Sequence, residues 1–217
     1  AYIPGHAHAD TLSFELAVGG DRVVVNGGTS TYERNAVRAH ERSTAAHTTV
    51  EVAGHNSSEV WAAFRVGRRA GVFATHTEVS SIGTAHAHAL ARASHDGYHY
   101  LSPPSTHTRT LKLGAIRLVV IDEVTGDAPA VARFPFVPTV SCVPQGDTNC
   151  TFTLTTGKQR TMTITLSAPG TIERTLWAPR FGRRIERDCL VVPFRGSLRT
   201  VLLHNMQAPT EGLERLP

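Results

Sequence analysis

Short runs of alternating or β-branched residues recur along almost the whole chain and constrain its fold more than any other feature. Examples are TLSFELAV, HTTVEV, TRTLKL, CTFTLTT and LRTVLLHN. Gly, Asn, Asp and Pro separate these runs at intervals of about eight to twelve residues, a spacing typical of antiparallel sandwiches and barrels. The sequence therefore predicts an all-β fold, a two-sheet antiparallel β-sandwich with long connecting loops. We expect residues 1–217 to form a single domain.

Few segments depart from the β pattern. The polar stretch TYERNAVRAHERST, residues 31–44, predicts a loop with a helical turn, in which Arg34, Arg38 and Arg42 recur at intervals of four. The turn-rich stretches 124–129 and 143–149 predict two hairpin turns.

The composition limits the partners that the protein can have. Lys112 and Lys158 are the only lysines among 22 basic residues, and the net charge is +4. Arginine suits carboxylate and sulfate ligands, because the guanidinium fork matches those oxyanions. The sequence offers no aromatic and basic platform of the kind that binds nucleic acid, so we expect no nucleic-acid partner. No stretch approaches the roughly 18 apolar residues of a membrane span, so we expect no membrane insertion.

The three cysteines give two separate expectations. Cys142 and Cys150 flank the turn-rich stretch VPQGDTN, and a disulfide could close that hairpin in an oxidising compartment. Cys189 lies in the apolar run CLVVPF, which predicts a buried free thiol.

The segment GHAHADTLSFEL, residues 5–16, carries the strongest chemical signal. It places His6, His8 and Asp10 at alternating positions, which would share one face of a strand. Such a cluster could form internal hydrogen bonds, bind a metal or transfer protons. A zinc site would need a further ligand from a neighbouring segment. The candidates are Asp10, Asp21, Asn26, His40, His47 and His55.

The order of several motifs resembles the C-terminal β domain of the heparinase II/III-like family. GHAHADTLSFEL is followed by RVVVNGGTSTYERN, RSTAAHTTVEV and WAAFRVGRR, and later by ASHDGY, LVVIDEVTG and LWAPRFGRR. The resemblance covers most of the chain and is sharpest over residues 5–67. It implies a supersandwich-like β domain that pairs with an N-terminal α/α toroid, which this chain does not contain. The abrupt start on the motif also leads us to expect a longer protein.

The resemblance also implies roles for individual residues. Members of known chemistry are polysaccharide lyases that cleave heparin, heparan sulfate or alginate in a cleft between the two domains. His6 matches the histidine that faces this cleft, and His8 and His47 match two ligands of a structural zinc. Arg38 and Arg42 would assist in recognising the substrate carboxylate. The expected location is the periplasm or the extracellular space.

Asn26 departs from the family pattern, because the third zinc ligand of the family is an aspartate at this position. A neutral amide oxygen is a poorer zinc ligand than a carboxylate. Two expectations therefore stay open. Either zinc is held by His8, Asn26 and His47, or the site is metal-free and Asn26 hydrogen-bonds the two histidines and fixes their tautomers.

Two functions are consistent with these observations. In the first, the chain supplies one wall of a lyase cleft that cleaves a uronate-containing acidic polysaccharide by β-elimination, while the isolated domain is inactive. In the second, it is a non-catalytic carbohydrate-binding or scaffold domain in cell-surface polysaccharide metabolism.

Overall fold

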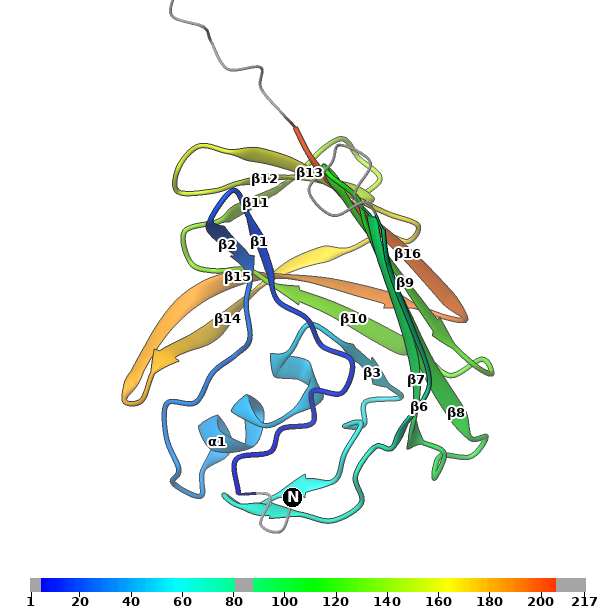
Figure 1. The fold of residues 1–217 in the computed structure, drawn as a ribbon. Helices are drawn as coiled ribbons and strands as arrows, with labels where there is room; N and C mark the ends of the chain where they lie inside the picture. The colour runs from blue at the N-terminus through cyan, green and yellow to red at the C-terminus, as the bar shows by residue number, and fades with distance from the viewer. Residues whose placement is uncertain (1–4, 81–87, 206–217) are drawn as a thin grey trace, which may run out of the picture.

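Two antiparallel sheets dominate the computed structural model, which describes residues 5–80 and 88–205 (Figure 1). The larger sheet has eight strands, in the spatial order β11 (Ser141–Pro144), β12 (Thr151–Thr155), β13 (Thr161–Leu166), β16 (Ser197–His204), β9 (Arg117–Val124), β8 (Ser105–Leu113), β7 (His88–Tyr98) and β6 (Val72–Ser80). The smaller sheet has four strands, in the order β14 (Thr171–Arg180), β15 (Arg183–Phe194), β10 (Ala130–Pro135) and β3 (Val50–Val52). This architecture confirms the predicted all-β sandwich.

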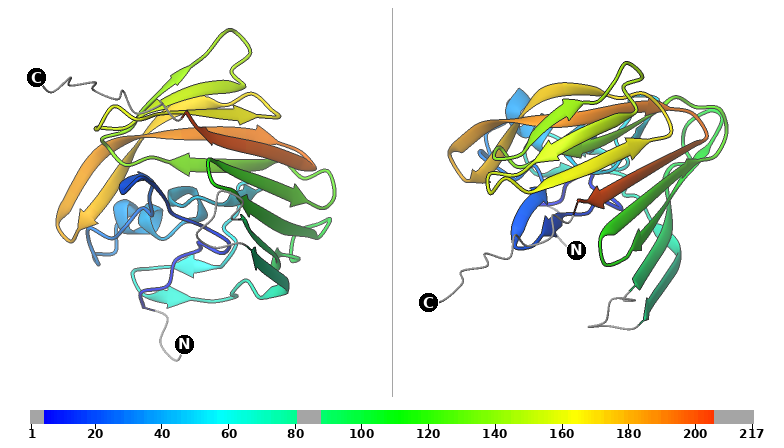
Figure 2. Two further views of the ribbon diagram at one scale, coloured as in Figure 1. Left: turned by 45° about the horizontal axis from the view of Figure 1, so that its top comes forward. Right: turned by 90° about the horizontal axis from the view of Figure 1, so that it is seen from above.

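Short elements surround the two main sheets. Two-stranded sheets are formed by β1 (Leu16–Val18) with β2 (Asp21–Val24) and by β4 (Val60–Trp61) with β5 (Arg65–Val66). The helix α1 (Ala36–Glu41) lies within the stretch predicted to contain a helical turn, which confirms that prediction, and the 3₁₀ turn η1 (Thr44–Ala46) begins at the last residue of that stretch. Figures 1 and 2 show α1 on the side of the four-stranded sheet where the N-terminal segment runs. None of the described helices is long and apolar enough to cross a membrane.

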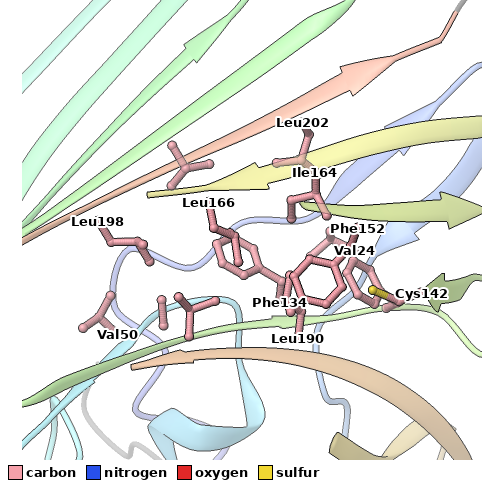
Figure 3. Close-up of a cluster of buried hydrophobic side chains, with 14 of the residues drawn as sticks. Val24, Val50, Phe134, Cys142, Phe152, Ile164, Leu166, Leu190, Leu198 and Leu202 are labelled. Atoms are coloured by element: carbon pink, nitrogen blue, oxygen red, sulfur yellow. The ribbon is translucent and has the colours of Figure 1, made fainter. Parts of the chain in front are cut away.

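The core lies between the facing surfaces of the two sheets (Figure 3). Buried and half-buried residues alternate along β12 and β13, as expected for strands with one face in the core. Phe134 and Leu190 from the smaller sheet pack near Phe152, Ile164 and Leu202 from the larger one. Each of these side chains is at most 3% exposed, so the core between the two main sheets is well packed.

The structure corrects one of the two predicted hairpin turns. Residues 143–149 do join the paired strands β11 and β12. The stretch 124–129 instead leads from β9 in the larger sheet to β10 in the smaller sheet. Turn residues mark where a strand ends, but they do not say whether the next strand pairs with it.

The cysteines are free thiols in the structure. Cys142 lies opposite Leu154 in the β11–β12 register, four residues along the chain from Cys150. At about 3.3 Å per residue, that offset exceeds the roughly 7 Å Cα separation that a disulfide tolerates. The expected Cys142–Cys150 disulfide therefore does not fit this register. Cys189 is 1% exposed, and its burial confirms the prediction for that thiol.

Candidate functional site

Residues 5–15 of the N-terminal motif form an irregular segment outside the strands, which corrects the expectation that residues 6–10 lie on a β-strand. Side chains that follow later in the chain bind its carbonyl groups instead. Arg38 donates to the carbonyl of Gly5 (3.2 Å), and Arg42 donates to that of Ala7 (3.0 Å). Because the segment belongs to no sheet, His6 and His8 need not share one environment, and they do not. His6 is exposed and His8 is half-buried.

Helix α1 presents the two arginines that hold this segment. The helix begins after Asn35, whose side chain accepts a hydrogen bond from the backbone N–H of Arg38 (3.0 Å) as a helix N-cap. Arg38 and Arg42 are each 1% exposed, whereas Arg34, before the helix, is exposed. The four-residue spacing places Arg38 and Arg42 on one helix face, and that face is buried.

The burial of these arginines does not fit the expected substrate contact. The guanidinium of Arg38 also donates to the carbonyl of Ala63 (3.3 Å), and that of Arg42 donates to the carbonyl of Ala62 (3.0 Å). Both side chains therefore connect the N-terminal motif to the β4–β5 hairpin. A buried arginine whose donors bind backbone carbonyls is an architectural element, because leaving the guanidinium unpaired in the interior would be costly.

His6 lies beside Tyr32 on the surface. The Nδ1 atom of His6 is 3.1 Å from the Tyr32 hydroxyl, and the two rings meet edge to face with centroids 5.3 Å apart. The Tyr32 ring also contacts Phe64 and Phe181, with centroid distances of 5.6 and 5.2 Å. We call His6, Tyr32, Phe64 and Phe181 the aromatic cluster.

The aromatic cluster has the features of a ligand surface. Its members come from four separate segments, and Tyr32, Phe64 and Phe181 are 36%, 47% and 62% exposed. Exposed aromatic rings that gather around a polar pair are uncommon unless they contact a partner. The hydroxyl of Tyr32 and the imidazole of His6 can exchange a proton, and Nε2 of His6 is the ring nitrogen not engaged by Tyr32.

His8 and His47 form a hydrogen-bonded pair below this surface. His47 is fully buried, and its Nδ1 donates to the carbonyl of Ser43 (2.8 Å), which leaves Nε2 as an acceptor. Nδ1 of His8 lies 3.1 Å from that Nε2 and therefore donates to it. Nε2 of His8 in turn lies 3.4 Å from both the Arg38 guanidinium and the Thr29 hydroxyl.

Both imidazoles of this pair are held in the neutral form. Burial lowers the pKa of His8, the neighbouring His47, Arg38 and Arg42 act in the same direction, and together they bring the pKa to about 3. Burial also lowers the pKa of His47, although Asp10 acts in the opposite direction. The chain of donors and acceptors from Arg38 to Ser43 is thus complete with both rings neutral.

Asn26, the expected third zinc ligand, has its side-chain oxygen bonded to the backbone and not to either histidine. The side-chain oxygen of Asn26 accepts a hydrogen bond from the backbone N–H of Gly28 (3.0 Å). Across the described residues, no group of three or more His, Cys, Asp and Glu side chains could hold a metal ion. A guanidinium also faces the remaining nitrogen of His8. Two imidazoles beside a fixed positive charge do not fit a four-ligand structural zinc site, which needs further anionic or imidazole ligands. In the structure the two histidines bond to each other, and the Asn26 side chain bonds to Gly28.

A buried polar network ties the site to the larger sheet. Gly97 donates to Nδ1 of His95 (3.1 Å), Nε2 of His95 lies 3.0 Å from Nδ1 of His107, and Nε2 of His107 lies 2.8 Å from Asp122. Arg109 pairs with the same carboxylate and donates to the carbonyls of Leu12 (2.9 Å) and Thr48. Through the carbonyl of Thr48, this network holds the chain next to His47.

The β14–β15 hairpin reaches the site from the smaller sheet. The backbone N–H of Ala178 donates to the carbonyl of Gly27 (2.9 Å), and that of Gly182 donates to the carbonyl of Ser30 (2.8 Å). Gly28 has φ +76°, and a Cβ there would lie 2.0 Å from the carbonyl oxygen of Ala178. Glycine is therefore required at this position for the hairpin to dock on the loop before Tyr32.

Sequence reasoning missed Phe64 and Phe181 as members of the site. Each is followed within two residues by arginine, in AFRV and RFGRR, and this aromatic and basic combination is the signal that could have identified them. Tyr32 and Trp61 are 36% and 47% exposed and do not belong to the core.

A polar cavity of about 350 Å³ lies beside the β4–β5 hairpin. The guanidinium of Arg68 lies 3.8 Å from the centroid of the Tyr100 ring, and His55 meets the same ring edge to face. Glu59 and Asn56 complete the polar lining. A ring face beside donors and acceptors suits a sugar residue.

Comparisons with known proteins agree on one family. The family model described as "Heparinase II/III-like, C-terminal" matches residues 1–210. Among solved structures, a heparan sulfate lyase from Pedobacter heparinus superposes with a TM-score of 0.72 at 15% identity, over 94% of this chain and 32% of that chain. A heparinase III structure gives a TM-score of 0.66 at 16% identity, over 92% of this chain and 30% of that chain. The chain therefore spans about a third of the length of these structures. A search of curated proteins found no match.

Proposed function

Because the chain belongs to the heparinase II/III-like C-terminal domain family, we propose that it forms one wall of a cleft in which an acidic polysaccharide is cleaved by β-elimination. The observation that carries this proposal is the exposed His6–Tyr32 pair, with 3.1 Å between its polar atoms, inside the aromatic cluster. In that position an imidazole can meet a polymer that lies across the surface.

The chemistry of uronate elimination suits such a pair. The reaction removes the weakly acidic proton at C5 of the uronate and protonates the oxygen of the leaving sugar. Positioned acid and base groups each contribute about 10²–10⁴-fold to such a rate. His6 would exchange a proton through Nε2, while Tyr32 fixes the ring through Nδ1. The aromatic rings of the cluster would face the sugar rings.

The rest of the site would come from a second domain. The chain spans only 32% and 30% of the two lyase structures with which it superposes. We propose that an N-terminal α/α toroid of the same protein supplies the opposite wall, including the groups that neutralise the substrate carboxylate. An acidic polysaccharide substrate would place the protein in the periplasm or outside the cell.

The full-length protein tests this proposal. It should release unsaturated uronate products, detected by their ultraviolet absorbance, from at least one polymer of a panel of heparin, heparan sulfate and alginate. The isolated chain should release none. A full-length protein that cleaves no uronate polymer in a broad panel would contradict the proposal.

The alternative function is a non-catalytic carbohydrate-binding domain, and the Arg68–Tyr100 cavity favours it. A binding module would lose affinity for its glycan in Tyr100→Ala and would show no turnover that depends on His6. A cleft wall would show the opposite pattern, with turnover that depends on His6 and tolerates Tyr100→Ala.

A further inference from the structure

The tip of the β14–β15 hairpin carries two arginines on one face. Arg180 and Arg183 are register partners across the two-residue turn of Phe181 and Gly182, and both are exposed. Directly opposed residues of an antiparallel pair project from the same side of the ribbon. Two like charges placed opposite each other are destabilising.

Within the part of the chain that the structure describes, no carboxylate compensates these charges. Neither Arg180 nor Arg183 has an acidic side chain within ion-pair distance, whereas Arg174, near the start of the same hairpin, pairs with Asp188 (2.8 Å). Arg195, just beyond β15, pairs with Asp127 (3.3 Å). Arg174 and Arg195 thus have carboxylate partners, whereas the two arginines at the tip have none among the described residues.

The tip is fixed to the candidate site. The N–H of Gly182 binds the carbonyl of Ser30, and the Phe181 ring lies 5.2 Å from the Tyr32 ring. Ser30 is itself held by Glu41, which accepts a hydrogen bond from its backbone N–H (2.9 Å). The turn that joins the two arginines is therefore held beside the aromatic cluster by these contacts and is not a free loop.

From this geometry we propose that Arg180 and Arg183 form an anion subsite that positions an acidic polysaccharide along the aromatic cluster. The subsite deepens the function proposed above and rests on it. Its ligands are the sulfate or carboxylate groups of sugar residues next to the one that reacts, because guanidinium groups bind such oxyanions through paired N–H donors. A polymer that spans the cluster and the tip would relieve the repulsion between the two arginines.

A binding experiment on the full-length protein tests the subsite. All variants carry His6→Ala, so that cleavage is slow during the measurement. Heparin and alginate serve as the probes. The double variant Arg180→Gln/Arg183→Gln is compared with Arg117→Gln/Arg199→Gln. The control removes two exposed arginines of the larger sheet that likewise have no acidic partner among the described residues.

The tip variant should bind its polymer about tenfold more weakly than the control variant at about 0.15 M salt, and the difference should shrink as salt rises. Arg180→Lys/Arg183→Lys should recover part of the lost affinity, because it restores the charge without the planar fork. Both double variants should unfold at the temperature of the parent, so that weaker binding is not misfolding.

Three results would overturn the subsite. Equal affinities of the tip and control variants would show that only total charge matters. A tip variant that loses binding to a DNA duplex, with polysaccharide binding unchanged, would assign the tip to nucleic acid. A loss of affinity in the tip variant that does not shrink as salt rises, with unchanged folding, would exclude an electrostatic subsite. Cleavage that depends on His6 but not on the tip would leave the proposed function standing, whereas no cleavage of any polymer would count against that function alone.

Discussion

Asp122 and Arg109 form a buried, bidentate ion pair in the larger sheet, with N–O distances of 2.8 and 3.0 Å. Burial by itself raises the pKa of Asp122, but the contacts with Arg109 and His107 outweigh burial and hold that pKa at about 2. The carboxylate is thus charged at every pH at which the protein would function. It anchors the guanidinium that binds the carbonyl of Leu12, four residues after His8, and the carbonyl of Thr48, directly after His47.

Removing this carboxylate should destabilise the whole domain. Asp122→Asn leaves a buried guanidinium without its counter-charge, and breaking a buried pair from one side costs about 3 kcal/mol or more in the free energy of unfolding. Denaturant unfolding measures this change. Glu123→Gln, next along the strand but exposed, serves as the control and should change stability by less than about 0.5 kcal/mol. Equal effects of the two substitutions would contradict the role of the pair.

Stability should fall as the pH drops below neutrality, because burial lowers the pKa of His95 to about 3. Between the ordinary value near 6.5 and 3, the unfolded chain binds a proton at this residue that the folded chain does not bind. Stability therefore rises with pH across this window, by up to about 1.4 kcal/mol per pH unit for one such group. His95→Gln should reduce this slope, measured by denaturant unfolding from pH 7 to pH 4. A slope identical to that of the parent would contradict the neutral, buried state of His95.

The sequence predicted the architecture better than the site, and the reason is physical. Alternating burial repeats locally along strands such as β12 and β13, and turn residues and apolar runs are local signals too, so the sandwich, its hairpin at 143–149 and the buried Cys189 could be predicted. The N-terminal motif also alternates, but Arg38 and Arg42 bind its carbonyl groups in place of a neighbouring strand. Whether a backbone group is bound by a strand or by a distant guanidinium cannot be read from local periodicity.

The site residues likewise depend on contacts between distant segments, which local periodicity does not predict. The resemblance pointed to His6, His8 and His47, and the structure brings His8 and His47 together but leaves Asn26 bonded to Gly28. Phe181 joins Tyr32 across a separation of about 150 residues along the chain. No pattern in either segment encodes that contact, because it depends on how the β14–β15 hairpin docks on the loop before Tyr32.

The buried arginines give a prediction that separates architecture from recognition. Arg38→Ala should lower the free energy of unfolding by about 3 kcal/mol, because it leaves the carbonyl groups of Gly5 and Ala63 without their donor. Arg34→Ala removes an exposed arginine from the same region and should be nearly neutral. Thermal unfolding of both variants checks this contrast. A stable Arg38→Ala variant with weakened polysaccharide binding would restore the substrate role that was first expected.

Metal analysis decides between the two expectations for the His8–His47 pair. We expect the purified protein to contain far less than one equivalent of zinc and to keep its unfolding temperature in the presence of a chelator. Asn26→Asp would supply the missing carboxylate and should increase the affinity for added zinc. One equivalent of zinc in the parent protein, lost in His47→Ala, would show that the site holds the metal after all.

The most direct test of the central claim is the rate of unsaturated uronate formation by full-length His6→Ala. His6 is exposed, so its removal should leave the unfolding temperature unchanged. The account predicts that kcat falls by about 10²–10⁴-fold on the best polymer, and that Tyr32→Phe, which loses the hydroxyl beside Nδ1, lowers kcat less. Full activity of a correctly folded His6→Ala protein would contradict the proposal that this chain supplies a catalytic wall.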